Sequence, residues 1–263
     1  LTLNWTDNGN PVGRATYTYE LHGDAAYTSL VSSANIVGLT SGAIASLTPN
    51  TTYYARLRSN NHDGTSNAFV SASTATTADT PGGPSFSAWT TTSLTVNWTD
   101  GANPVGKATY TYELHGDAAY TSLVSSKTAL GTLTSGAING LTPNTTYYAR
   151  VRSSNHSGTF NAFVSASSAT IAEDPTSPTF SAVTTAALTL NWTDNGNPVG
   201  RTTYTYELHS TAGYTALVSS KTQISLSSGE IASLSGNTTY YARVRSHNHD
   251  VSSNAWVGSS TST

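Results

Sequence analysis

The sequence contains no cysteine and no methionine in 263 residues, and only 10% of its side chains are charged. The absence of cysteine excludes disulfide scaffolds, thiolate metal sites and cysteine nucleophiles. With 11 basic and 14 acidic residues, the chain has no basic surface to neutralise phosphates, which argues against nucleic-acid binding. No apolar run approaches the roughly 20 residues that cross a bilayer, so we expect neither membrane insertion nor a targeting segment in these residues.

Hydroxyl side chains take the place of the missing charges. Ser and Thr together number 84, whereas hydrophobic residues make up 37% of the chain and include 15 Tyr and 5 Trp. Burying one large apolar side chain contributes about 1.5–3 kcal/mol, so this content is sufficient for a core. We therefore expect a folded protein with a hydroxyl-rich surface, stabilised by packing.

One sequence unit occurs three times. Residues 1–7 return as residues 94–100 and again as 188–194, at intervals of 93 and 94 residues, and residues 1–33 share 29 identities with residues 94–126. An interval of this length corresponds to a whole small domain rather than to a solenoid repeat. We therefore predict three tandem domains, at residues 1–80, 84–174 and 178–263.

Within each copy, apolar and polar residues alternate with the period of a β-strand, and residues typical of turns interrupt the alternation. No segment has a helical period, so we predict an all-β fold. The strands predicted in the first copy are residues 1–5, 15–22, 27–31, 43–47, 52–58 and a segment from 67 onward. Two proline-containing segments, 80–84 and 174–178, are predicted to be short, stiff linkers.

The segment before the fifth predicted strand resembles the tyrosine corner of fibronectin type III domains. It has Leu, Pro, Thr and Tyr at alternate positions in residues 47–53 and 141–147, and Gly236 replaces the proline in the third copy. The resemblance implies three tandem fibronectin type III-like, immunoglobulin-like β-sandwiches, each with a buried corner tyrosine whose hydroxyl bonds to backbone upstream and with a core tryptophan on strand B. The residues so assigned are the corner tyrosines Tyr53, Tyr147 and Tyr240 and the core tryptophans Trp5, Trp98 and Trp192.

The first copy lacks the segment that the resemblance assigns to strand A. The second and third copies are preceded by residues 86–89 and 180–183, whereas the first copy opens on strand B. Either the chain is part of a longer array, which we favour, or a neighbouring subunit supplies the missing strand to an open sheet edge.

The resemblance also implies that two polar loops of each copy meet at the pole that faces the preceding domain. In the first copy these loops are residues 7–10 and 60–64, and in the third copy they are residues 194–197 and 247–250. Their oxygens are of the kind that bind Ca²⁺, but Asp, Asn and Gly are also the residues that turns require. We favour the turn interpretation and predict no cofactor, with Ca²⁺ at the interdomain loops as the alternative.

A histidine ends the second predicted strand of each copy, which the resemblance assigns to strand C. These residues are His22, His115 and His209. The local sequence offers no metal-ligand partners beyond Asp24 and Asp117. We therefore predict histidines that face solvent or a domain interface.

Tyrosine and arginine alternate on the outer face of the fifth predicted strand of each copy, which the resemblance assigns to strand F. A glutamate on the neighbouring strand C is predicted to pair with arginine across the strands, which contributes little when the pair is exposed. The alternative is a stripe that contacts another protein, because interfaces favour this composition. The candidate contact residues are Tyr54, Arg56, Tyr148, Arg150, Tyr241 and Arg243.

Sequons for N-glycosylation occur in each copy. Those on the turn that enters strand F are the more plausible acceptors, and they are Asn50, Asn144 and Asn237. A glycoprotein is expected only if the source glycosylates its secreted proteins.

No arrangement of residues typical of catalysis is present, so we predict a protein that is not an enzyme. The composition suits an extracellular or cell-surface structural protein that acts as a stalk, an adhesin or a filament subunit, with self-association or other surface proteins as partners. Two alternatives remain. One is an array of modules that bind glycans or proteins; the other is a spacer in a larger secreted enzyme or virion tail protein.

Overall fold

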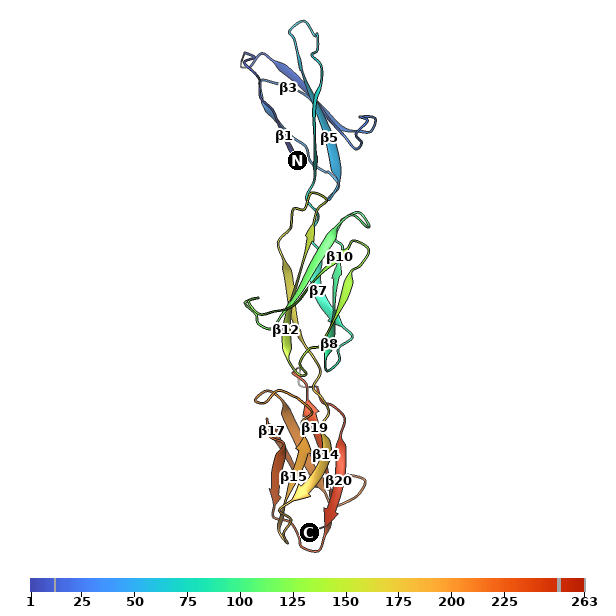
Figure 1. The fold of residues 1–263 in the computed structure, drawn as a ribbon, viewed down its shortest axis with the longest axis vertical. Coiled ribbons are helices and arrows are strands. Elements are labelled where there is room, and N and C mark those ends of the chain that lie inside the picture. Colours follow the sequence, from blue (N-terminus) through green and yellow to red (C-terminus); the bar gives the residue numbers. More distant parts are fainter. Residues whose placement is uncertain (12, 250–251, 263) are drawn as a thin grey trace.

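The computed structural model describes residues 1–11, 13–249 and 252–262, and these residues form 20 β-strands and no helix. The strands build three β-sandwich units that follow one another along an elongated rod (Figure 1). Accordingly, the described part of the chain offers no helix that could cross a membrane.

The strands of the first unit are β1 (Thr2–Asn4), β2 (Thr16–His22), β3 (Leu30–Val37), β4 (Ser41–Ala43), β5 (Thr52–Asn60) and β6 (Val70–Ala75). Those of the second unit are β7 (Gly82–Ser87), β8 (Ser93–Thr99), β9 (Thr109–His115), β10 (Leu123–Leu130), β11 (Ser135–Asn139), β12 (Thr146–Ser154) and β13 (Val164–Ala169). Those of the third unit are β14 (Thr176–Ser181), β15 (Ala187–Thr193), β16 (Thr203–His209), β17 (Leu217–Ile224), β18 (Ser228–Ala232), β19 (Thr239–His247) and β20 (Val257–Ser262).

Each unit packs a small sheet against a four-stranded sheet. In the second unit the orders are β11-β8-β7 and β10-β9-β12-β13, and in the third unit they are β14-β15-β18 and β17-β16-β19-β20. The first unit pairs β1 with β4 only and has β3-β2-β5-β6 as its larger sheet. All the paired strands are antiparallel, as in β9 against β12. The prediction of an all-β fold of tandem sandwiches is confirmed.

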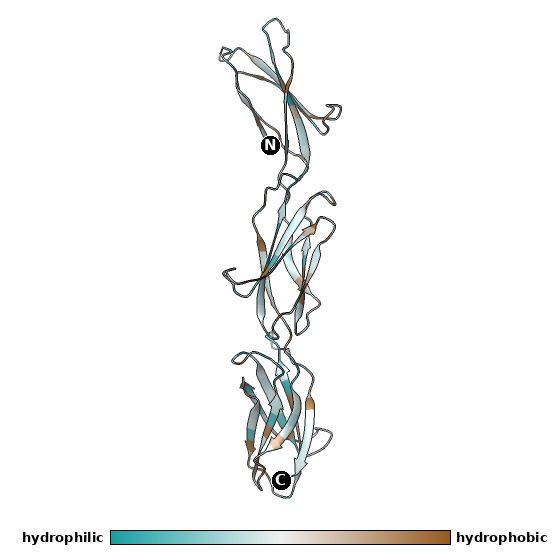
Figure 2. Cartoon of the chain, in the orientation of Figure 1, coloured by the Kyte–Doolittle hydropathy of each residue, from teal (hydrophilic) through white to brown (hydrophobic). Residues whose placement is uncertain are grey.

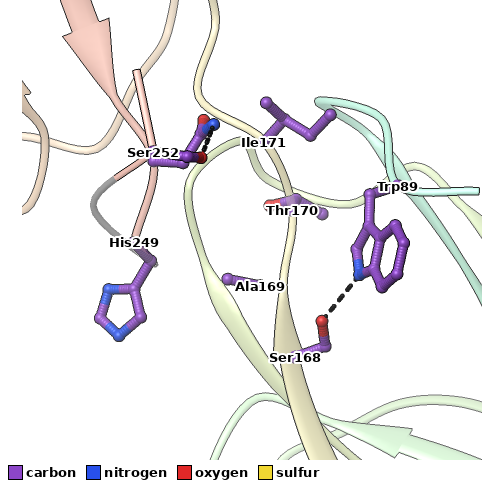
Figure 3. Close-up of a pocket in the computed structure, with 8 residues that line it drawn as sticks. Trp89, Ser168, Ala169, Thr170, Ile171, His249 and Ser252 are labelled. Atoms are coloured by element: carbon purple, nitrogen blue, oxygen red, sulfur yellow. Dashed lines mark hydrogen bonds between the residues drawn. The ribbon is translucent and has the colours of Figure 1, made fainter. Parts of the chain in front are cut away.

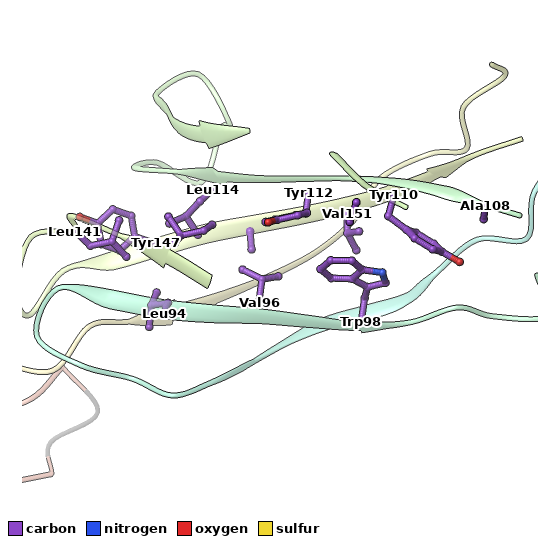
Figure 4. Packing of buried hydrophobic residues seen from close by; sticks show 13 residues of the cluster. Leu94, Val96, Trp98, Ala108, Tyr110, Tyr112, Leu114, Leu141, Tyr147 and Val151 are labelled. Atoms are coloured by element: carbon purple, nitrogen blue, oxygen red, sulfur yellow. The ribbon is translucent and has the colours of Figure 1, made fainter. Parts of the chain in front are cut away.

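The alternation of apolar and polar residues along β8 and β9 directs apolar side chains into the core of the second unit. Strand β8 directs Leu94, Val96 and Trp98 inward, and β9 directs Tyr110 and Tyr112 toward them from the opposite sheet (Figure 4). The indole of Trp98 lies 5.8 Å from the Tyr110 ring and 5.1 Å from the Tyr112 ring, measured between centroids. Most of the ribbon is pale or teal and strongly hydrophobic residues form isolated bands, in line with the 84 Ser and Thr residues of the sequence (Figure 2).

The core of the first unit is smaller. Trp98 and Trp192 are each 4% exposed, whereas Trp5 is only partly buried. In the other two units a flanking strand brings Phe86 or Phe180 against the core. Strand β1 has no such neighbour among the described residues, so the core assignment of Trp5 holds only in part.

Two predicted segments differ from the observed ones. The third strand begins at Leu30 rather than at residue 27, because the Asp24 carboxylate accepts a hydrogen bond from Thr28 N at 2.8 Å and holds the chain in a turn. The predicted linkers overlap β7 and β14, so the chain passes between units at residues 76–81 and 170–175 instead.

Candidate functional site

The tyrosine corner lies where the chain enters strand F, which is β5, β12 and β19 in the three units. In the second unit, Thr142 N donates a hydrogen bond to Tyr147 Oη at 2.9 Å, and the Tyr147 side chain is 5% exposed. The same bond joins Thr48 N to Tyr53 Oη at 3.0 Å, and in the third unit Tyr240 Oη accepts from the backbone five residues upstream at 3.0 Å despite the glycine in its corner.

The outer face of each larger sheet carries a cluster of glutamate, histidine and arginine. In the second unit, Arg150 Nε donates to Glu113 Oε2 at 2.6 Å, and His115 Nε2 lies 3.1 Å from the same oxygen. The register of β9 and β12 places Glu113 directly opposite Arg150. The equivalent pairs, at 2.6–2.8 Å, are Arg56 with Glu20 and Arg243 with Glu207.

Aromatic rings cover this cluster. The Arg150 guanidinium lies 5.0 Å from the centroid of the Tyr120 ring and 4.2 Å from that of Phe163, and Arg152 lies 4.0 Å from that of Phe160. Such contacts add about 0.5–2 kcal/mol each, depending on desolvation. The arginines of the predicted contact stripe therefore bind within their own unit, which favours the surface ladder over a protein-contact stripe.

The three histidines are buried within their own units, so the prediction that they face solvent or a domain interface is wrong. His22, His115 and His209 are only 2–3% exposed. The cause is the turn after β9, which is strand C of the second unit. In this turn Tyr120 takes a φ of 57° and folds over His115, with the two ring centroids 5.3 Å apart. Sequence reasoning missed this cover because it assigned the equivalent Tyr27 to a strand.

The cluster affects the ionisation of its glutamates. Burial alone would raise the pKa of Glu113, but the hydrogen bonds from Arg150 and His115 outweigh it and lower the pKa. The pKa values of Glu20 and Glu207 are lowered in the same way.

We expect acid to destabilise the protein through these glutamates. A carboxylate whose folded pKa is depressed stabilises the fold above its unfolded pKa, near 4.5, and this stabilisation is lost as the pH falls through the folded value. Glu113→Gln should therefore lower the melting temperature by more at pH 7 than at pH 3. Thermal unfolding across that range measures the difference, with the exposed Glu230→Gln as control. A Glu113→Gln penalty that is the same at both pH values would contradict the assignment.

At the first junction, three polar side chains of the second unit hold the linker that precedes it. Asp79 N donates to Asn103 Oδ1 at 2.7 Å, and Asn103 Nδ2 donates back to Asp79 O at 2.9 Å. Ser153 Oγ donates to the same carbonyl at 2.7 Å, and Asn161 Nδ2 donates to Ala78 O at 2.6 Å. Ser153 is fully buried and Asn103 is 7% exposed, so water competes little for these bonds. We call these three side chains the linker clasp.

The second junction repeats the linker clasp with Asn197, Ser246 and Asn254. Glu173 N donates to Asn197 Oδ1 at 2.8 Å, and Asn197 Nδ2 donates to Glu173 O at 2.9 Å. Ser246 Oγ donates to Glu173 O at 2.8 Å, and Asn254 Nδ2 donates to Ala172 O at 2.6 Å. Thus the same four hydrogen bonds recur, one unit further along the chain.

A buried tyrosine supports the linker clasp in each unit. Asn103 Nδ2 also donates to Tyr110 Oη at 3.3 Å, and Tyr110 Oη donates to Asp100 O at 3.1 Å. Burial raises the pKa of Tyr110 to about 12, so its hydroxyl stays protonated. The junction is thereby continuous with the core through Trp98, which packs on Tyr110.

The polar loops of the third unit meet at the second junction, as predicted, where Asn197 and Asn248 bond to the linker. Those of the first unit lie at its outer pole and make no bond to a linker among the described residues. No group of three or more His, Asp or Glu residues among the described residues could hold a metal ion. Asp250, a member of one predicted loop, lies outside the described residues. The role of these loops in holding linkers could not be read from their composition, because Asn and Ser are also common turn residues.

Two of the three predicted glycan acceptors are buried in the junctions. Asn50 is 4% exposed and its Oδ1 accepts from His156 N at 2.8 Å, whereas Asn144 is 3% exposed and its Nδ2 donates to Thr202 Oγ1 at 3.1 Å. A glycan on either amide has no room once the junctions form. Asn237 is exposed, so it alone of the three keeps an accessible amide.

A shallow pocket of about 300 Å³ lies at the second junction (Figure 3). Trp89, which is 48% exposed, forms one side of it, and its Nε1 donates to Ser168 Oγ at 2.8 Å. Residues Ala169 and Thr170 lie between Trp89 and His249 (Figure 3). The pocket joins one exposed aromatic ring to hydroxyl groups.

The strand order, the tyrosine corner and the end-to-end junctions define a tandem array of immunoglobulin-like β-sandwiches. Residues 79–166, which span the second unit, match the family model of the fibronectin type III domain. A two fibronectin type-III domain segment from chicken tenascin is similar in structure, with a TM-score of 0.51 and 16% identity over 70% of this chain and 100% of that chain. At this identity the similarity shows the fold alone. No curated protein matches the chain. The whole chain resembles tandem fibronectin type III domains.

Proposed function

We propose that the chain is a non-enzymatic extracellular spacer, a semi-rigid rod that sets a fixed distance in a cell-surface stalk, adhesin or filament. Fibronectin type III repeats are common in extracellular structural and adhesion proteins and are typically non-enzymatic. Its partners are copies of itself or other surface proteins. The observation that carries the proposal is the recurrence of the linker clasp.

Four hydrogen bonds to the linker at each junction explain why such a rod resists bending. Each buried bond contributes about 0.5–1.5 kcal/mol, and a bend at the junction must break several at once. Flexible interdomain motion is otherwise the ordinary expectation for domains joined by short linkers. A junction held in this way suits a protein whose function depends on the length of the rod and on the orientation of its ends.

Small-angle scattering on the intact chain tests the rod. Asn103→Ala combined with Asn197→Ala removes two linker bonds at each junction, so we expect a shorter and broader distribution of interatomic distances than in the parent chain. Asn139→Ala, at an exposed position on β11, is the matched control. A compact parent chain, or an unchanged distribution in the double variant, would remove the spacer proposal. Protease accessibility on intact cells tests the extracellular location.

Glycan binding is the second candidate function. The observation that favours it is Trp89, whose exposed ring beside Ser168 resembles the combination of aromatic face and hydroxyls that suits a sugar. The third unit has Val183 at the equivalent position, so this feature does not recur along the rod. The recurring linker clasp therefore supports the spacer function better.

A further inference from the structure

The first unit carries the same linker clasp at its outer pole, the end that faces away from the second unit. Its residues are Asn10, Ser59 and Asn67, which stand where Asn103, Ser153 and Asn161 stand in the second unit. The loops that bear them lie at the outer end of the first unit in Figure 1.

The internal bonds of this clasp match those of the two that hold linkers. Asn10 Nδ2 donates to Asp7 O at 2.7 Å and to Tyr17 Oη at 3.1 Å, and Asn67 Nδ2 donates to Ser59 Oγ at 2.7 Å. The bonds equivalent to these three measure 2.6, 3.3 and 2.9 Å in the second unit and 2.8, 3.1 and 2.9 Å in the third. The side chains are thus in place before any linker binds, which lowers the entropic cost of binding.

Exposure separates the first clasp from the others. Asn10 and Asn67 are exposed and Ser59 is half-buried, whereas Ser153 and Ser246 are fully buried beneath their linkers. The polar atoms that hold a linker elsewhere therefore face outward here.

The turn next to the first clasp matches the turn of the third unit and differs from that of the second. Asn8 has a φ of 52° and precedes Gly9, as Asn195, with a φ of 54°, precedes Gly196. Asn195 Nδ2 donates to Asp174 O at 2.7 Å, which is a further bond to the linker of the second junction. The second unit has Gly101 at this position and makes no such side-chain bond.

From these observations we propose that the outer pole of the first unit is a docking site for the linker of a preceding unit of the same kind. The occupant is an extended segment of the form Thr-x-Ala-Glu-Asp, held by Asn10, Ser59 and Asn67 and, through its last carbonyl, by Asn8. The inference deepens the spacer function, because each unit added at this pole would extend the rod with the geometry of the second junction.

A four-unit chain tests the proposal. Residues 84–187 are joined directly to Leu1, which is equivalent to Leu188, so that the added linker precedes the intact chain. Segmental ¹⁵N labelling of the added part in one sample and of the native part in a second sample allows hydrogen exchange to be followed at both copies of Glu173. We expect protection of this amide comparable to that in the native second junction, and a loss of about tenfold or more in Asn10→Ala.

The same molecule contains its controls. Exchange in the core of the added unit reports its folding in every variant. Asn139→Ala in the added unit should leave the protection of the added linker unchanged. An added Glu173 amide that exchanges at the same rate with and without Asn10, while the native Glu173 amide stays protected, would overturn the docking site alone. Unprotected amides at the native junctions as well would instead remove the spacer function.

Discussion

Trp98→Ala should destabilise the second unit by about 3–5 kcal/mol, the range for truncating a large aromatic residue in a core. The side chain is 4% exposed and packs against two tyrosine rings at 5.1–5.8 Å. Aromatic pairs of this kind contribute about 0.5–1.5 kcal/mol beyond the area they bury. Because single domains are stable by only about 5–15 kcal/mol, this loss is a large part of the stability of the unit.

Hydrogen exchange with mass spectrometry on the intact chain resolves the effect, because it reports the opening of each unit separately. Trp98→Phe keeps a ring in the core and removes a buried indole N–H that has no hydrogen-bond partner among the described residues, so it should cost much less than Trp98→Ala. Trp89→Ala, at an exposed position, is the matched control. Equal losses in Trp98→Ala and Trp89→Ala would contradict the assignment of Trp98 to the core.

The effect should also reach the first junction. Trp98 packs on Tyr110, Tyr110 bonds to Asn103, and Asn103 holds the linker at Asp79. Removing the indole leaves Tyr110 without its packing partner. Protection of the Asp79 amide should therefore fall in Trp98→Ala together with that of the core.

The fold could be predicted because its signals are local and repeated. The alternation that buries Leu94, Val96 and Trp98 is visible in seven consecutive residues, and the corner motif fixes the position of Tyr147. The pairing of Glu113 with Arg150 was predicted from alternation together with the resemblance, which implies that strands C and F are neighbours. The register of β9 and β12 places the two residues opposite each other.

The functional surfaces were predicted less well because their contacts join distant segments. Asn50 bonds to a residue 106 positions away and Asn144 to one 58 positions away, and nothing in the local sequence distinguishes such contacts from a turn. The cover over His115 depends on the left-handed conformation of Tyr120, which alternation does not reveal.

Tyr147→Phe should destabilise the second unit by about 1–3 kcal/mol, because it leaves Thr142 N–H without its hydroxyl acceptor in a partly buried corner. Tyr148→Phe, on the outward, half-buried face of the same strand, is the matched control and should cost less. Denaturant unfolding followed by hydrogen exchange compares the two, and equal losses would show that the corner hydroxyl does not stabilise the unit.

The corner variant should also loosen the second junction, since the corner loop forms one side of it. Thr142 O accepts from Thr170 Oγ1 at 2.6 Å, and Asn144, in the same loop, donates to Thr202 in the third unit. A corner that shifts on loss of the Tyr147 hydroxyl carries Asn144 with it. Exchange at the Glu173 amide should therefore rise in Tyr147→Phe and not in Tyr148→Phe, whereas a junction unaffected by both substitutions would show that the corner stabilises only its own unit.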